Sequence, residues 1–450
     1  MAERLGKRAG LYKNILITAL VALALVQTYF LWFPNASSRS RIAAFGSWLQ
    51  AAKDETRNSF VSPYRILTNS GAEGGGYFHI QYNGINDSEI KLACDELIVS
   101  AVRDSAYEGG KPLDYKELYR EPSVIYEYAF PIPSGLFAEG FGLRNAGLAQ
   151  ITECVEAVVI SPAEGGAKVI FVGNGEAHEY GVGENFEIPE APQADIRYES
   201  SALAGYDYFA ENVFIPRFPS GSYQYPSIVI VNPYVPGERL RHIVLENVAH
   251  LFANPAAIIP YTGANSVYTY SDENTVVKYY RNDVLEYSCY KYPGNGNPSL
   301  FDNYRAATAF INADKMIVNE TFLAGYETDG EKTSFYFDYA INNMRIILPE
   351  AAITDAESPV RHAVEITMAN ETVVSYKKHV YNYLIDYTSA GRASLGFDGF
   401  LKETPDWADR APGAFYGSAP VLGYSAGSRS QAFLYWFMDI GGEPFYVSAQ

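Results

Sequence analysis

The hydrophobic and polar positions of this 450-residue chain begin with one long apolar run near the start. Residues 15–33, ILITALVALALVQTYFLWF, contain no charged side chain. As a helix this run spans about 28 Å at ~1.5 Å per residue, close to the thickness of the hydrocarbon core of a bilayer. The pattern therefore predicts a transmembrane helix, which we place at residues 14–34.

The charges before this run predict its orientation. Four basic side chains and one acid precede it: Arg4, Lys7, Arg8, Lys13 and Glu3. The positive-inside rule makes residues 1–13 a cytoplasmic stub and the C-terminal bulk extracytoplasmic. A cleaved signal peptide is the alternative, but its apolar region usually has about 7–15 residues, fewer than this run. We expect an uncleaved, single-pass anchor in the cell membrane.

Beyond the anchor, helical and alternating patterns follow one another. Residues 238–252 and 299–313 have helical periodicity, and Ser299 is a suitable N-cap for the second. Alternating segments with turn residues between them follow each helix, which is typical of an antiparallel meander. A helix-plus-meander unit that occurs twice predicts an α+β fold, with helices packed on antiparallel sheets.

A proline-rich, acidic stretch near residue 190 resembles a linker. We expect three extracytoplasmic α+β domains, at 35–190, 191–295 and 296–450. The expected helices of the first domain lie at 41–53 and 88–107. The expected strands outside the two meanders are 64–68, 76–82, 124–130, 154–160 and 167–172. Those within the meanders include the hairpins 320–326 with 333–339 and 360–368 with 372–381, and three strands separated by turns at 272–274 and 281–283.

Charge and cysteine content narrow the function classes. The net charge of −18 argues against nucleic-acid binding, which depends on basic side chains that neutralise phosphates. Cys94, Cys154 and Cys289 form no C-x-x-C pair. We expect small buried thiols rather than a disulfide framework. The 37 tyrosines fall mostly in expected strands, where a ring can be buried while its hydroxyl stays in water.

One motif suggests a hydrolase. Gly423-Tyr424-Ser425-Ala426-Gly427 has the G-x-S-x-G form of a nucleophile elbow, whose histidine should follow the serine in the chain. All six histidines precede Ser425, so the motif lacks its base. We interpret the segment as a glycine- and serine-rich loop and expect no catalytic residues.

Metal and phosphate sites are weakly indicated. His242, Glu246 and His250 share one helix face by their spacing, but they lie opposite the apolar face and should meet solvent. His178-Glu179 has no second histidine at metal-binding spacing, so we expect it to lie on a wet surface as well. The glycine-rich stretches lack the Lys-Ser/Thr or the following helix of a phosphate loop. The sequence therefore predicts no metal and no cofactor.

The membrane run carries candidate contact residues. Gln27 is an amide in apolar surroundings, where polar side chains bond across helices. Thr18 and Ala22 form a small-xxx-small pair that allows close approach of another helix. We predict that Thr18, Ala22 and Gln27 contact a membrane partner. Snorkelling of Gln27 to the interface is the alternative.

Two segments resemble a known family. SVIYEYAFPIPSGLF (123–137) is similar to a strand that ends in an F-P-x-P-like turn in the YycH proteins of Gram-positive bacteria. LFANPAAI (251–258) resembles the family's L-F-x-D/N-P-S segment, and the strands up to residue 288 resemble its Y-T-D-G…L-x-Y run. Residues 300–450 resemble the related YycI-type module in pattern.

This resemblance implies a membrane-anchored accessory protein of a WalK (YycG) sensor histidine kinase, in a two-component system that controls cell-wall metabolism. A YycI-type accessory protein is the second implied partner. Two alternatives stay open: an anchored envelope enzyme that uses Ser425 or a pair of acids that the sequence does not identify, and a cell-wall glycan- or peptide-binding module with tyrosine stacking platforms.

Overall fold

A computed structural model describes residues 61–450 except for several internal stretches. These are 70, 72–75, 80–88, 105–106, 144–146, 189–195, 219–220, 235–239, 253, 263–267, 292–297, 315–316, 318, 343, 350–351, 354–357, 405–418, 427–429 and 441–442. The predicted anchor and the helix expected at 41–53 lie outside the described residues. Within the described part, no helix is both long and apolar enough to span a bilayer. The α+β class with antiparallel sheets is confirmed.

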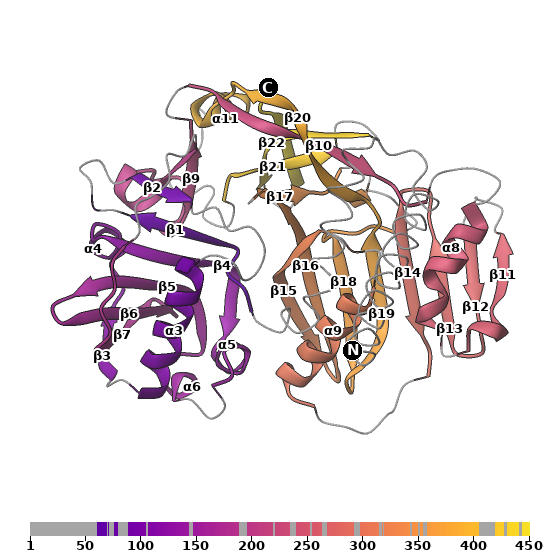
Figure 1. The fold of residues 1–450 in the computed structure, drawn as a ribbon, viewed down its shortest axis with the longest axis horizontal. Helices are drawn as coiled ribbons and strands as arrows, with labels where there is room; N and C mark the ends of the chain where they lie inside the picture. The colour runs from indigo at the N-terminus through magenta and orange to yellow at the C-terminus, as the bar shows by residue number, and fades with distance from the viewer. Residues whose placement is uncertain are drawn as a thin grey trace, which may run out of the picture. The chain divides into compact units, whose positions relative to one another are not determined.

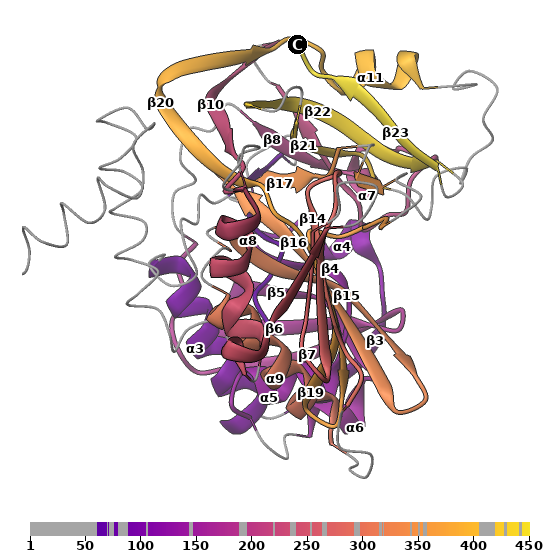
Figure 2. The same ribbon diagram turned by 90° about the vertical axis from the view of Figure 1, so that its right-hand side faces the viewer.

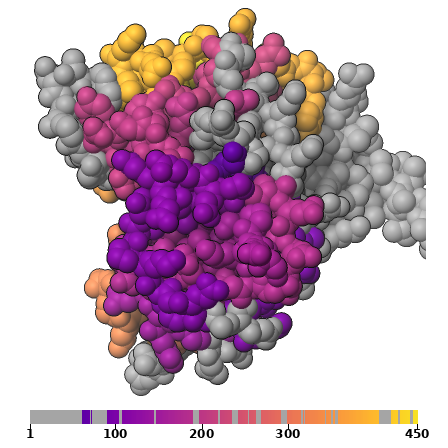
Figure 3. All heavy atoms as spheres, turned by 90° about the vertical axis from the view of Figure 1, so that its left-hand side faces the viewer, coloured from indigo at the N-terminus to yellow at the C-terminus, as the bar shows by residue number. Residues whose placement is uncertain are grey.

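The first sheet has nine antiparallel strands in the order β3-β7-β6-β5-β4-β1-β2-β8-β9 (Figure 1). Helix α3 (Glu89–Asp104) packs on β6 and β7, and α5 (Ser134–Gly140) packs on β4 and β5. Figure 3 shows the side of the molecule where these residues, indigo to magenta, face the viewer. The strand bounds are β1 Arg65–Asn69, β2 Gly76–His79, β3 Tyr107–Pro112, β4 Ser123–Pro133, β5 Cys154–Ala163, β6 Gly166–Gly173, β7 Glu176–Val182, β8 Arg197–Ser200 and β9 Phe214–Arg217. Short helices α4 (Tyr115–Leu118), α6 (Leu148–Ile151) and α7 (Ser201–Ala204) connect them.

The second sheet has fourteen strands. Twelve follow the order β11-β12-β13-β14-β19-β18-β16-β17-β21-β22-β10-β20, while β15 pairs with β16 and β23 with β22. Its one parallel pair is β17 with β21. The bounds are β10 Tyr223–Val231, β11 Ile259–Thr262, β12 Tyr268–Ser271, β13 Thr275–Tyr279, β14 Val284–Cys289, β15 Glu320–Asp329, β16 Lys332–Ile341, β17 Met344–Ile347, β18 Val364–Ala369, β19 Thr372–His379, β20 Asn382–Ala393, β21 Val421–Ala426, β22 Gln431–Ile440 and β23 Glu443–Ser448.

Helices cover one face of this second sheet. Helix α9 (Leu300–Ala313) packs on β16, β18 and β19, and α8 (Leu240–Val248) lies on the same side in Figures 1 and 2. Ser299 caps α9 through a capping box with Asp302, so the predicted cap is confirmed. The 3₁₀ turns Ala249–Leu251 and Pro255–Ala257 follow α8, and α11 (Phe397–Glu403) lies near β9.

Several expected hairpins are confirmed, among them β5–β6, β15–β16 and β18–β19. One strand boundary differs: β4 continues through Pro131 to Pro133, because its register against β5 shifts between Glu127 and Ile132 and so accommodates the proline. β14 pairs with β19, so strands from both sides of residue 295 lie in one sheet. The three-domain division stays a prediction.

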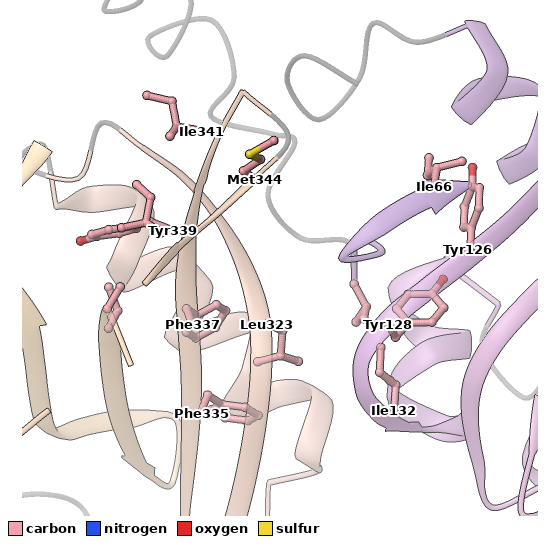
Figure 4. Packing of buried hydrophobic residues seen from close by; sticks show 14 of the residues in the cluster. Ile66, Tyr126, Tyr128, Ile132, Leu323, Phe335, Phe337, Tyr339, Ile341 and Met344 are labelled. Atoms are coloured by element: carbon pink, nitrogen blue, oxygen red, sulfur yellow. The ribbon is translucent and has the colours of Figure 1, made fainter. Parts of the chain in front are cut away.

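The cores of the sheets consist of large aliphatic and aromatic side chains (Figure 4). Ile66, Tyr126 and Ile132 are almost fully buried in the first sheet, and Phe335 and Phe337 in the second. Alternation explains this burial: in β16 the odd-numbered positions Phe335 and Phe337 turn toward α9, where Tyr304 packs against both rings.

The edges of the sheets carry strand-breaking features. Four edge strands contain a proline: Pro112 in β3, Pro216 in β9, Pro260 in β11 and Pro444 in β23. In the edge strand β20, residues 387–389 bulge out between Asp386, opposite Ser227, and Ala390, opposite Pro226. The edge strand β15 lies against β4 instead, and the ring centroids of Tyr326 and Phe130 are 5.9 Å apart. Proline removes a backbone donor and a bulge breaks the ladder, so further pairing at these edges is disfavoured.

Candidate functional site

The three predicted membrane contacts, Thr18, Ala22 and Gln27, lie outside the described residues. Their role therefore stays a prediction. The other sequence candidates lie within the described part, and each can be placed.

The segment around Ser425 is a strand, so the expectation of a loop is wrong. Ser425 lies in β21, opposite Phe433 of β22 and beside Ile347 of the parallel strand β17. It is 4% exposed. A nucleophile elbow instead sits on a sharp turn between a strand and a helix, with its hydroxyl accessible. The position of Ser425 therefore does not support the hydrolase alternative.

Packing explains the glycine of the motif. A Cβ at Gly423 would lie 2.5 Å from the backbone oxygen of Arg345 in β17. Glycine at this position lets β21 approach the parallel strand. The motif thus reflects close packing between strands rather than chemistry.

We expect Ser425→Ala to change the free energy of unfolding by less than about 1.5 kcal/mol, because it removes one hydroxyl without adding volume. Gly423→Ala should cost about 1–3 kcal/mol, because the added methyl group overpacks the strand contact. Denaturant unfolding of both variants measures the difference. A fluorophosphonate probe should leave the folded protein unlabelled; labelling that Ser425→Ala abolishes would restore the hydrolase reading.

The helix-face prediction for His242, Glu246 and His250 is confirmed. The Nε2 of His242 lies 3.1 Å from Oε1 of Glu246, with the two side chains 72% and 51% exposed. His250 is also exposed, while Val244 and Val248 on the opposite face are buried. No metal-ligating group of three or more side chains is found among the described residues.

His178 corrects another expectation, because it is buried rather than wet. It lies in β7, and its Nδ1 is 3.1 Å from the Tyr107 hydroxyl of β3. The sequence did not predict β3, whose residues YEGGKP alternate weakly. This strand covers the edge of β7 and excludes water from the imidazole.

The cysteines are free thiols. Cys94 is buried as expected, and burial raises its pKa to about 12, so the thiol is not reactive at neutral pH. Cys154 and Cys289 are partly exposed, which differs from the expectation.

Many strand tyrosines are buried completely. The hydroxyls of Tyr234, Tyr383 and Tyr424 are themselves buried, so the expectation of wet hydroxyls is wrong for them. Exposed tyrosines are found at positions 107, 261, 290 and 387. They lie on different strands or strand ends, and this arrangement does not form one extended stacking platform.

A polar junction forms where the β13–β14 turn meets β10 and the end of β19. The carboxylate of Asp283 accepts hydrogen bonds from Asn232 Nδ2 at 2.8 Å, Tyr279 Oη at 2.5 Å and Tyr381 Oη at 2.7 Å. Its backbone oxygen accepts from Val380 N at 3.0 Å. Asp283 has φ of 61°, a left-handed conformation that aspartate tolerates better than most residues. We call this set of residues the Asp283 junction.

A second polar cluster lies beneath α9. The Nζ of Lys378 donates to Oδ2 of Asp314 at 2.5 Å, and the hydroxyl of Tyr376 donates to the same oxygen at 2.7 Å. Both members of the ion pair are at most 2% exposed. The pair joins the end of α9 to the middle of the sheet.

A third cluster fixes β17. The Asp338 carboxylate contacts Arg345 and the Nδ1 of His362, and it accepts from Ala363 N at 3.2 Å. Burial alone would raise the pKa of Asp338, but the Arg345 charge and the hydrogen bonds outweigh it and hold the pKa below its usual value. Asp338 therefore stabilises the fold above its usual pKa range and loses this contribution as pH falls through the lowered pKa.

The face of the meander opposite α9 is partly exposed. One cross-strand row consists of Lys278, Glu286, Lys377 and Glu365, with alternating charges. At the β11 end of this face, Ile259 and Tyr261 are each 53% exposed, and β11 and β12 contain no charged residue. Such an uncharged apolar patch at the edge of an acidic protein suits a protein contact.

The sequence did not indicate the Asp283 junction or the Asp314–Lys378 pair. Asp283 was recognised only as a turn residue. Asn232 and Tyr381, which bond to Asp283, and Lys378, which bonds to Asp314, lie about 50–100 residues away along the chain, so no local signal reveals these contacts. The tyrosine-rich strands were the available indication that polar groups would be buried.

Comparisons with known proteins identify the fold. No family model and no curated protein matches the sequence. The chain is similar to the crystal structure of YycH from Bacillus subtilis, with a TM-score of 0.54 and 12% identity, over 87% of this chain and 96% of that one. The predicted resemblance is thereby confirmed for the fold.

Two other structures align less closely. An uncharacterized protein from Eubacterium rectale has a TM-score of 0.31 and 13% identity, over 50% of this chain and 84% of its own. The C-terminal domain of YpeB from Bacillus megaterium has a TM-score of 0.25 and 12% identity, over 48% of this chain and 93% of its own.

Proposed function

We propose that this chain is a non-enzymatic, membrane-anchored accessory protein that modulates a sensor histidine kinase. The kinase is of the WalK (YycG) type, in a two-component system controlling cell-wall metabolism, and a YycI-type protein is a second partner. The observation that carries the proposal is the YycH-like fold over most of both chains. The segments 123–137 and 251–288, which suggested the family, form β4 with α5 and the β11–β14 meander.

The buried charged clusters are structural. Asp283, Asp314 and Asp338 each bond to groups of other strands, and these contacts hold the sheets together. A candidate contact surface is the pair Ile259 and Tyr261 at the end of the meander, each 53% exposed. A partner could contact this patch outside the membrane while Thr18, Ala22 and Gln27 contact it within.

Modulation in this proposal is a shift between two kinase states. An accessory protein changes the equilibrium only if it binds one state more tightly than the other. Contacts in the membrane and outside it supply such a difference when the kinase helices pack differently in the two states. The acidic exterior does not recruit nucleic acid.

Photo-crosslinking in intact membranes tests the proposal. A benzophenone amino acid at Gln27, or at Thr18 on the opposite side of an ideal helix, should capture a sensor kinase. Ile17 serves as the matched control, because in a helix with 3.6 residues per turn it lies between the two contact directions, about 80° from Gln27 and about 100–140° from Thr18 and Ala22. We expect Ile17 to capture the kinase at least about threefold less than the better of the two contact positions.

Capture of only lipid or self-dimers at positions 18 and 27 would contradict the proposal. Recovery of the mature protein in the medium, cleaved beyond Pro34, would contradict the anchor itself. Alanine at both Ile259 and Tyr261 should separately weaken kinase co-purification in mild detergent if the meander patch is a contact.

A further inference from the structure

His379 is a buried histidine at the junction of the meander with the rest of its sheet. It ends β19 and is 1% exposed. Its ring lies 4.5 Å from that of Tyr381, edge to face. Its Nδ1 is buried without a hydrogen-bond partner. The backbone places it opposite Val284, the residue after Asp283.

The polar groups near this imidazole are a carboxylate, tyrosine hydroxyls and a lysine that is already paired. Asp283 lies in the β13–β14 turn, and its carboxylate bonds to the hydroxyls of Tyr279 and Tyr381. The hydroxyl of Tyr339 from β16 donates to the backbone oxygen of His379. Lys378, the neighbour in β19, is bound to Asp314. The carboxylate of Asp283, whose charge acts on His379, already accepts three hydrogen bonds.

We propose that His379 is an acid-sensitive latch between the β11–β14 meander and the remainder of the sheet. Neutral His379 fits the buried junction. A proton on its ring puts a charge into an apolar environment and competes with Tyr279, Tyr381 and Asn232 for the Asp283 carboxylate. The β14–β19 ladder then opens locally, and with it the attachment of the strand that carries Ile259 and Tyr261. This property is independent of the partner proposed above.

The direction of the pH effect agrees with this geometry. Burial lowers the pKa of His379 from 6.5 to about 4, and the Asp283 charge offsets only part of that effect. Above pH 6.5 both the closed and the open junction carry neutral histidine, so the latch is fully closed. Between pH 6.5 and 4 the open junction takes up a proton that the closed one excludes, so opening becomes easier. Between pH 7 and pH 5 the opening equilibrium should rise roughly twentyfold.

Amide hydrogen exchange of the full-length chain in lipid nanodiscs tests the latch. Peptides covering 276–290 and 372–386 should lose about twentyfold in protection between pH 7 and pH 5, after correction for the intrinsic exchange rate. Peptides of β5 and β6 in the first sheet serve as an internal reference. His379→Phe keeps the aromatic contact with Tyr381 and cannot be protonated, so its junction should show no such pH-dependent loss.

His242→Phe is the control, because this side chain is 72% exposed and should leave the wild-type pH response unchanged. His379→Gln provides a second non-titrating variant if phenylalanine prevents folding. An unchanged pH response in a folded His379 variant would overturn the latch, as would equal loss of protection in β5 and β6.

Discussion

Lys378→Met is expected to lower the free energy of unfolding by about 3–5 kcal/mol, because it leaves the buried carboxylate of Asp314 without its counter-charge. The hydroxyl of Tyr376 would remain as a donor to this carboxylate, but it carries no charge. The measurement is urea unfolding followed by fluorescence, with Trp436, which is fully buried in the same sheet, as a local probe.

Lys377→Met is a matched control for this prediction. Lys377 precedes Lys378 in β19, but it points to the partly exposed face, opposite Glu286 and Glu365. An ion pair in such a position is worth about 0–1 kcal/mol. The double variant Asp314→Leu with Lys378→Met should recover part of the lost stability, since it removes both charges. Equal losses in Lys377→Met and Lys378→Met would refute a special role for the buried pair.

Asp283→Ala should cost about 2–5 kcal/mol, the second-largest effect we expect. The change removes the acceptor of three side-chain donors, two of which are tyrosine hydroxyls, and it places alanine in a left-handed conformation. Leaving partly buried donors unsatisfied costs about 1–3 kcal/mol, and the backbone strain adds about 1–2 kcal/mol. Chemical unfolding reports the total, and exchange of the Val380 amide reports the local loss.

Asp283→Asn separates the two contributions. Asparagine tolerates the left-handed conformation and keeps one acceptor oxygen, so this variant should lose clearly less stability than alanine. Asp272→Ala is a matched control within the same meander. Asp272 accepts from the amides of Asn274 and Thr275 within its own turn, so its loss should cost only about 1–2 kcal/mol. An Asp283→Ala variant no weaker than Asp272→Ala would show that the junction does not stabilise the sheet.

The sequence predicted the elements whose signals are local. The N-cap at Ser299 and the hairpin of 320–326 with 333–339 depend on residues close to one another in the chain, and both occur as expected. The burial of Val244 and Val248 in α8 was equally predictable, because the helical periodicity of apolar residues determines which side of a helix is buried.

Features that depend on distant partners were missed. Ser425 looked like a loop residue because glycine and serine are poor strand formers, yet β17 and β22 flank its strand and bury it. His178 looked wet because the strand that covers it, β3, has no clear alternation. The bonds of Asp283 and Lys378 to their partners depend on the order of strands in the sheet, which no local pattern encodes.

The prolines at positions 112, 216, 260 and 444 and the bulge at 387–389 have a consequence for recognition. A protein with long sheets and unbroken edge strands could otherwise associate with its neighbours through main-chain hydrogen bonds. An extended peptide that binds only through its backbone finds few free backbone hydrogen-bonding groups at the prolines and the bulge of these edges, whatever the sequence of the peptide. Selectivity for any binding partner must then come from the shape and chemistry of side chains, so substitutions on the surface can change what the protein binds without altering the scaffold.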